Sequence, residues 1–176
     1  MRILALDLGV KTGWCVGSSS ESFNLGTEIW SKPKEVTAWR KTRQDRRGDP
    51  RMTRFGYWLL THHGNVDKVI FEDVEFCKTR MQCQLWASWR TVIWMTFPEP
   101  SIECVPVGAL KKFATGNGGA GKNGMAAALA ASNPKRFTVD KTPKKGHIIK
   151  DRGEPLTDDA VDAYWLFQWA QKHIIL

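Results

Sequence analysis

The chain has 176 residues, of which 42% are hydrophobic and 25% are charged. This balance is typical of one soluble globular domain and argues against a disordered or membrane-embedded chain. The formal net charge of +8 and the pI near 9.5 predict a polyanionic partner, and nucleic acid is the commonest one.

Cysteine usage and the first residues bear on the compartment. The four cysteines, Cys15, Cys77, Cys83 and Cys104, include no C-x-x-C pair, so we expect no zinc site. Cys15 and Cys104 lie in predicted strands and are expected to be small core residues of a protein in a reducing compartment. The first apolar run is short and stops at Asp7, so it predicts neither a signal peptide nor a membrane span. We therefore expect a cytoplasmic protein without membrane partner or organic cofactor.

The first part of the chain predicts an antiparallel meander. Residues 2–8 form a continuous apolar run, as in a buried central strand. A turn at 9–13 leads to a second strand at 14–17, and a serine-rich turn at 18–21 leads to a third strand at 23–30.

The rest of the chain alternates helices with strands around two basic segments. Basic insertions are expected at about 31–54 and 133–156, and the second is interpreted as a long mobile loop. The other expected elements are a helical pattern at 52–60, a strand at 67–74, a helix at 79–96, a strand at 101–105, a helix at 106–113, a helix at 123–131 and a helix at 158–172. This order predicts a single α/β domain over residues 1–176 with a mixed sheet.

Four acidic residues stand where predicted elements end or begin. Asp7 ends the first strand and Glu72 the fourth, while Asp159 and Asp162 share one face of the last helix at i, i+3. Carboxylates that converge repel one another unless a cation lies among them, and hard oxygen ligands favour Mg²⁺ or Mn²⁺. In a basic chain, this pattern predicts a metal-dependent enzyme that acts on nucleic acid.

The two strand acids also have ordinary structural alternatives. Asp7 could cap a turn, and Glu72 could pair with a surface lysine. Asp73 and Glu75 compete with Glu72 for its role, because neighbouring residues of a strand face opposite sides of the sheet.

The helix acids have an alternative of their own. Asp158 and Asp159 could simply favour the positive end of the helix dipole, behind an N-cap at Thr157. Whether Asp158 or Asp159 is the ligand stays open from the sequence.

Four stretches together resemble one known family. They are the strand 3–9 with Thr-Gly-Trp at 12–14, the strand 69–74, Val-Pro at 105–106 leading to Gly-Ala-Gly-Lys at 119–122, and Asp-Ala-Val-Asp-Ala at 159–163. The chain resembles the RuvC-type Holliday junction resolvases of the ribonuclease H-like superfamily, in their phage or viral branch. The resemblance implies a ribonuclease H-like mixed five-stranded sheet, with its first three strands antiparallel, flanked by helices. For a phage protein it also implies the host cytoplasm.

The same resemblance implies the catalytic residues. Asp7, Glu72, Asp159 and Asp162 match the metal-binding carboxylates, and Lys122 matches a lysine near the scissile phosphate. Two Mg²⁺ or Mn²⁺ ions about 3.5–4 Å apart would activate a water and stabilise the leaving 3′ oxygen. We therefore expect a structure-selective endonuclease that resolves Holliday junctions or other branched DNA, in DNA recombination and repair.

Basic and aromatic side chains are expected to contact the DNA. Trp39 stands among arginines, which suits stacking combined with phosphate contact, and Phe76 could stack on an unpaired base at the crossover. For Phe76 the alternative is packing under the following helix, and for the basic residues of 31–54 around Trp39 it is a solvated surface. The predicted DNA-binding residues are Phe76, Trp39, Arg40, Lys41, Arg43, Arg46, Arg47, Lys111, Lys112, Lys122, Lys144 and Lys145.

Family members dimerise so that two sites cut opposed strands, and the resemblance therefore implies a homodimer. Trp86, Trp89 and Trp94 on the helix at 79–96 are candidates for a two-fold interface, with core packing as the alternative.

Other functions share parts of this pattern. A ribonuclease H or a YqgF-like enzyme acting on RNA has the same opening strand and turn. An actin/Hsp70-like ATPase also has a strand followed by Asp and Gly, but it needs two such domains. A non-catalytic junction-binding protein would keep the basic surface but has no reason to keep four converging acids.

Overall fold

The computed structural model describes residues 1–41, 49–74, 77, 79–98, 101–142 and 146–174. Its strands are β1 (Ile3–Asp7), β2 (Lys11–Gly17), β3 (Phe23–Ile29), β4 (Lys68–Asp73), β5 (Ile102–Pro106), β6 (Phe137–Thr142), β7 (Gly146–Asp151) and β8 (Glu154–Pro155). Its helices are α1 (Pro33–Lys41), α2 (Pro50–His63), α3 (Arg80–Thr96), α4 (Val107–Thr115), α5 (Lys122–Ser132) and α6 (Asp158–His173). Within these ranges, no helix has the length and apolar character needed to cross a membrane.

The central sheet has five strands in the order β3-β2-β1-β4-β5. The first three strands pair antiparallel, while β4 pairs parallel with β1 and β5 parallel with β4. The predicted mixed five-stranded sheet is confirmed. Because β1 lies in the middle and its four residues Ile3 to Leu6 are fully buried, the residue that ends it enters a covered environment.

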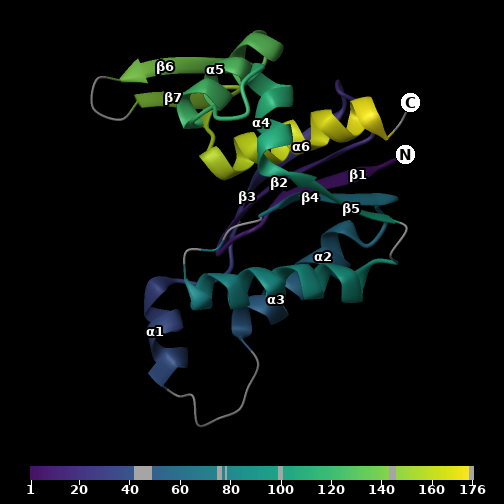
Figure 1. Cartoon of the computed structure of the whole chain (residues 1–176), viewed down its shortest axis with the longest axis vertical. Helices are drawn as coiled ribbons and strands as arrows, with labels where there is room; N and C mark the ends of the chain where they lie inside the picture. Colours follow the sequence, from purple (N-terminus) through teal and green to yellow (C-terminus); the bar gives the residue numbers. More distant parts are fainter. Residues whose placement is uncertain (42–48, 75–76, 78, 99–100, 143–145, 175–176) are drawn as a thin grey trace.

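Helices cover both faces of the central sheet (Figure 1), and strand alternation divides the core between the two faces. Ile3 and Ala5 pack against α6, and Leu4 and Leu6 pack against α2 and α3 on the opposite face. The same alternation continues to Asp7, which therefore belongs to the α6 side of the sheet.

The α2/α3 layer is rich in aromatic side chains. Trp30, Phe55 and Trp89 are buried together, and Phe55 meets Trp89 edge-on with ring centroids 5.0 Å apart. The Trp30 Nε1 donates to the buried Thr12 Oγ1 at 2.7 Å, which ties the end of β3 to β2. This layer is a packed scaffold below the sheet.

A second, three-stranded sheet, β6-β7-β8, lies above α6 next to α5 (Figure 1). The expectation of a long mobile loop at 133–156 is wrong for the described residues of that segment. Phe137 and Ile149 are buried in the α6 layer, and the Phe137 ring meets the Tyr164 ring at 5.3 Å. These apolar residues alternate along the strands and face the core, so the basic segment forms a sheet. The prolines and lysines around them hide this alternation in the sequence.

Three smaller expectations also change. The second strand begins at Lys11, so the predicted turn at 9–13 ends before that residue. Cys104 on β5 is exposed, whereas Cys15 is buried as expected. Trp89 belongs to the core while Trp94 stays half exposed, so the tryptophans of α3 do not act as one group.

Candidate active site

Two of the candidate carboxylates stand at the same edge of the central sheet. Strands β1 and β4 are parallel, with Leu6 opposite Phe71, and the next positions along the two strands are Asp7 and Glu72. Ile70 packs in the α6 layer, so Glu72, two residues later, faces α6 as Asp7 does.

Asp73 faces the other side of the sheet. Its Oδ1 lies 3.5 Å from Nη1 of Arg90 on α3, so it has a structural partner in the scaffold layer. Of the competing acids, Glu75 lies outside the described residues, and Glu72 is the one on the face of Asp7.

The remaining candidate carboxylates, Asp159 and Asp162, lie on the first turns of α6. Thr157 caps this helix by accepting from the Ala160 backbone N at 3.2 Å, and its hydroxyl lies 2.5 Å from that of Thr27 on β3. The predicted N-cap is confirmed.

Gly13 permits the close approach of α6 to β2. A Cβ at this position would lie 1.9 Å from the Asp159 carbonyl oxygen, and Gly13 is the antiparallel partner of Asp7. The absent side chain therefore lets the start of α6 lie directly on the strand that pairs with Asp7.

The four acids act on one another electrostatically. Burial raises the pKa of the Asp7 carboxyl well above its ordinary value, and the charges of Asp162, Glu72 and Asp159 raise it further. Burial, followed by the charge of Glu72, raises the pKa of Asp162 to about 7. The pKa of Glu72 is raised by burial and held back by Lys111. Four acids from three elements thus share one partly buried environment.

Two lysines offset this negative charge. Lys111 on α4 lowers the pKa of both Glu72 and Asp162. The Lys122 Nζ lies 2.7 Å from Asp158 Oδ2, and this contact raises the pKa of Lys122. Asp159, unlike Asp158, is among the charges that act on Asp7.

Lys11 lies beside the candidate site and was not predicted from the sequence. Its Nζ lies 3.4 Å from Asp159 Oδ2, at the start of β2. The sequence predicts a turn at this position, and β2 begins three residues before the predicted strand at 14–17. Alternating strand positions from Gly13 back to Lys11 are the signal that was present.

The donor set fits a hard divalent cation in its chemistry. Carboxylate oxygens are the ligands that Mg²⁺ and Mn²⁺ prefer, and burial together with neighbouring carboxylates raises the pKa values of Asp7 and Asp162. In the part of the chain that the structure describes, no three His, Cys, Asp or Glu side chains lie close enough together to bind one metal ion. The carboxylates therefore form an electrostatic cluster whose side chains are not drawn together around a single point.

The predicted DNA-contact residues fall into several surroundings. Trp39 is half-buried in a cleft with Met81 and Leu85 of α3, and the Arg51 Cζ lies 6.0 Å from its ring centroid. Lys41 and Lys112 are exposed, and Arg40 lies on α1. Outside the described residues lie Phe76, Arg43, Arg46, Arg47, Lys144 and Lys145.

Comparisons with known proteins bear on the fold. No protein-family model matches the chain, and no curated protein matches it. The chain is similar to T. thermophilus RuvC in complex with Holliday junction substrate, with a TM-score of 0.60 and 15% identity over 97% of this chain and 95% of that one. It is also similar to a second Thermus thermophilus RuvC structure, with a TM-score of 0.54 and 15% identity over 94% and 90%. At this identity the likeness shows the fold, and the predicted ribonuclease H-like arrangement is confirmed.

Proposed function

We propose that this protein is a structure-selective endonuclease that resolves Holliday junctions or other branched DNA by metal-dependent phosphodiester hydrolysis. One observation carries the proposal: carboxylates from β1, β4 and α6 lie on one side of the sheet within one another's electrostatic influence. The RuvC-like fold, seen in a complex with a Holliday junction substrate, supports the choice of substrate. The net charge of +8 supports a polyanionic partner.

Asp7, Glu72, Asp159 and Asp162 would hold two Mg²⁺ or Mn²⁺ ions. Such ions, when bound, activate a water for attack on phosphorus and stabilise the leaving oxygen. Asp7 ends the central strand, between Glu72 on β4 and the two α6 aspartates above, so it is the carboxylate suited to serve both halves of the site.

The lysines contribute to binding and to charge balance. Lys111 and Lys122 lie beside the carboxylates and would offset charge that develops on the phosphoryl oxygens. Lys122 is exposed and paired with Asp158, so it can exchange that carboxylate for a DNA phosphate at little loss.

The proposal includes a homodimer that cuts two opposed strands of a phage recombination or repair intermediate. The exposed Trp94 and Met95 on α3, 50% and 83% exposed, are apolar side chains that a two-fold partner would cover. DNA contacts by the basic segments 31–54 and 133–156 belong to the same proposal.

Asp7→Asn tests the proposed function. This variant should bind a synthetic four-way junction with wild-type affinity in EDTA and should cut it at least about 100-fold more slowly in Mg²⁺. The matched control is Asp67→Asn, which changes an aspartate at the opposite end of β1, where Asp67 accepts from the Arg2 backbone N. That control should cut normally.

Substrate comparison completes the test. Four-way, three-way, flap and linear duplex DNA, together with an RNA hairpin, should be cut in an order that favours the branched DNA.

Three outcomes would contradict parts of the proposal. Normal cutting by Asp7→Asn would remove the metal-site argument. Equal cutting of linear duplex would remove the junction preference, and preference for the RNA hairpin would favour the ribonuclease alternative.

A further inference from the structure

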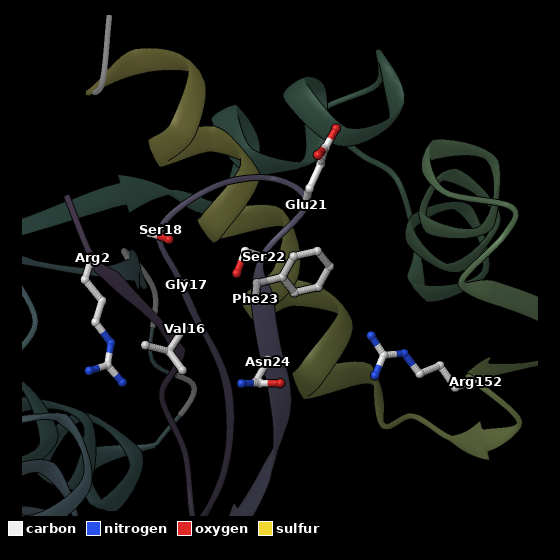
Figure 2. A pocket seen from close by; sticks show the side chains of 9 residues that line it. All are labelled: Arg2, Val16, Gly17, Ser18, Glu21, Ser22, Phe23, Asn24 and Arg152. Carbon is white, nitrogen blue, oxygen red and sulfur yellow. The ribbon is translucent and has the colours of Figure 1, made fainter.

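A polar cavity lies beside the start of β1 and the β2–β3 turn (Figure 2). Because Asp7 ends β1, this is the end of the central sheet away from the carboxylates. Its volume is about 410 Å³, and its walls come from Arg2, from residues 16–18 and 21–24 around the β2–β3 turn, and from Arg152. Strand β1 starts beside Arg2 and ends at Asp7, so five residues separate the two ends. At about 3.3 Å per residue, the cavity lies about 17 Å from the carboxylate end.

The lining carries two cationic side chains and several uncharged polar ones. Arg2 and Arg152 stand on two sides of the cavity, with the uncharged polar side chains of Ser18, Ser22 and Asn24 between them (Figure 2). The Glu21 side chain, the one carboxylate of the lining, points away from Arg2 and Arg152 (Figure 2). Hydroxyl and amide groups between two guanidinium groups are partners for phosphate oxygens.

Arg152 occupies a backbone conformation that its residue type disfavours. Its φ is 52°, and among the described residues it is the single non-glycine residue with positive φ. Arg152 and Gly153 form the two-residue turn between β7 and β8, with Asp151 opposite Glu154. Asn, Asp or Gly is the favoured first residue in such a turn. Because the backbone conformation at this position disfavours arginine, the presence of arginine suggests that its side chain has a role.

The two walls of the cavity are fixed to each other. Arg136 donates from Nε and Nη2 to both carboxylate oxygens of Asp151, each at 2.8 Å. Its guanidinium lies 4.0 Å from the Phe23 ring centroid, and its Nη1 donates to the Phe23 carbonyl at 3.2 Å. The Arg152 backbone N in turn donates to the Arg136 carbonyl at 3.1 Å. The turn that carries Arg152 is therefore held against the start of β3.

We propose that this cavity binds the phosphates of a sugar–phosphate backbone, as a second contact to the DNA that the carboxylate site cuts. The planar guanidinium group matches phosphate geometry, and two of them on opposite sides suit successive phosphates of one strand. The choice of DNA as the source of the phosphates rests on the proposed function. At about 3.4 Å of rise per nucleotide, the separation of 17 Å corresponds to about five nucleotides from the cut.

Arg152→Asn tests this inference without unfolding the turn. Asparagine accepts the left-handed conformation better than arginine does, so the melting temperature should stay the same or rise. Junction binding, measured by fluorescence anisotropy in EDTA, should weaken several-fold. The slope of log affinity against log salt should fall by about 1, which is the loss of one phosphate contact. Arg152→Lys, which keeps the charge, should recover most of that slope.

The control is Lys172→Asn, which removes the same charge on the last turn of α6 outside the lining of the cavity. Its slope should match the wild type. An equal fall in both variants would mean a general effect of net charge, and no fall in Arg152→Asn would remove the site. Either result overturns the inference.

Two further measurements identify the source of the phosphate. Ethylation of junction phosphates about five nucleotides from the cut should weaken wild-type binding and leave Arg152→Asn unaffected. If inorganic phosphate instead raises the melting temperature of wild type alone while the junction slopes coincide, the ligand is a free phosphate and the DNA assignment is overturned. All binding is measured without metal, so a failure of cleavage counts against the proposed function and leaves this result standing.

Discussion

The two faces of the central sheet are built from the same strands and differ in their chemistry. On the α2/α3 face, Trp30, Phe55 and Trp89 fill the core. The acid that ends β4 on this side, Asp73, is paired with Arg90, whose guanidinium also lies 4.8 Å from the ring centroids of Trp86 and Trp94. The carboxylate of Asp73 thus has a cationic partner on this face.

On the α6 face the carboxylates lie close enough to repel one another electrostatically. Asp7 and Asp162 have raised pKa values because they are buried beside other acids, and nearby lysines offset this only in part. The contrast shows that alternation along a strand places neighbouring acids in different surroundings. The acid on one face forms an ion pair, and the acids on the other face lie close to one another, which suits a bound cation.

The largest expected effect comes from changing adjacent residues of β4. Glu72→Gln should slow junction cleavage at least about 100-fold, because it removes a carboxylate from the α6 face. Asp73→Asn should leave cleavage within a few-fold and lower the free energy of unfolding by about 1 kcal/mol or less, because it removes a partly exposed ion pair. Single-turnover cleavage and urea unfolding measure both effects. Equal loss of cleavage in the two variants would contradict the division between the faces.

The next effect comes from filling the space at Gly13. Gly13→Ala should push α6 away from β2, lower the free energy of unfolding by about 1–3 kcal/mol and reduce cleavage, because a Cβ would meet the Asp159 carbonyl. Gly108→Ala is the matched control, since a Cβ there meets nothing within 4 Å and alanine favours a helix. Thermal unfolding and cleavage should separate the two variants. Wild-type cleavage by Gly13→Ala would mean that the close approach of α6 is unnecessary.

The stability of the protein should depend on pH through Asp162 on the α6 face of the sheet. The pKa of Asp162 is raised to about 7, so the folded protein holds a proton that the unfolded chain releases near pH 4. In EDTA this contribution to stability is present below about pH 4 and is lost as the pH rises to about 7. The gain in free energy of unfolding from Asp162→Asn should therefore grow over that range, as followed by chemical denaturation at each pH. A gain that does not change with pH would mean that Asp162 titrates normally.

The smallest expected effect is at the cap of α6. Thr157→Ala should lower the free energy of unfolding by about 1 kcal/mol, because it removes the acceptor for the Ala160 backbone N. Thr157→Ser keeps a hydroxyl and should retain most of the stability in the same unfolding experiment. A loss in the serine variant as large as that in alanine would mean that methyl packing, rather than the cap, stabilises this end.

Much of the central sheet could be predicted because its strands are strongly patterned. The apolar run that ends at Asp7 and the run that ends at Glu72 each specify a buried strand with an acid at its end. Their common face could not be fixed from the sequence, because the choice between Glu72 and Asp73 depends on which side α6 covers. Gly13 shows the same limit, since its contact with Asp159 joins residues far apart in the chain.

The second sheet was missed because its signals are weak one by one. Phe137 and Val139 alternate, but lysines and prolines surround them, and the turn at Arg152 lacks the usual Asn or Asp. Only packing against Tyr164 of α6 reveals Phe137 as a core residue. The ion pair between Lys11 and Asp159 likewise joins residues far apart in the chain.

Calorimetric titration with Mn²⁺ tests the central claim, that acids from three elements together hold two divalent cations. Wild type and Asp73→Asn should each bind two ions per chain, while Asp7→Asn and Asp162→Asn should lose at least one of them and keep a cooperative unfolding transition. Two ions bound with unchanged affinity in Asp7→Asn, or none bound by wild type, would contradict the account.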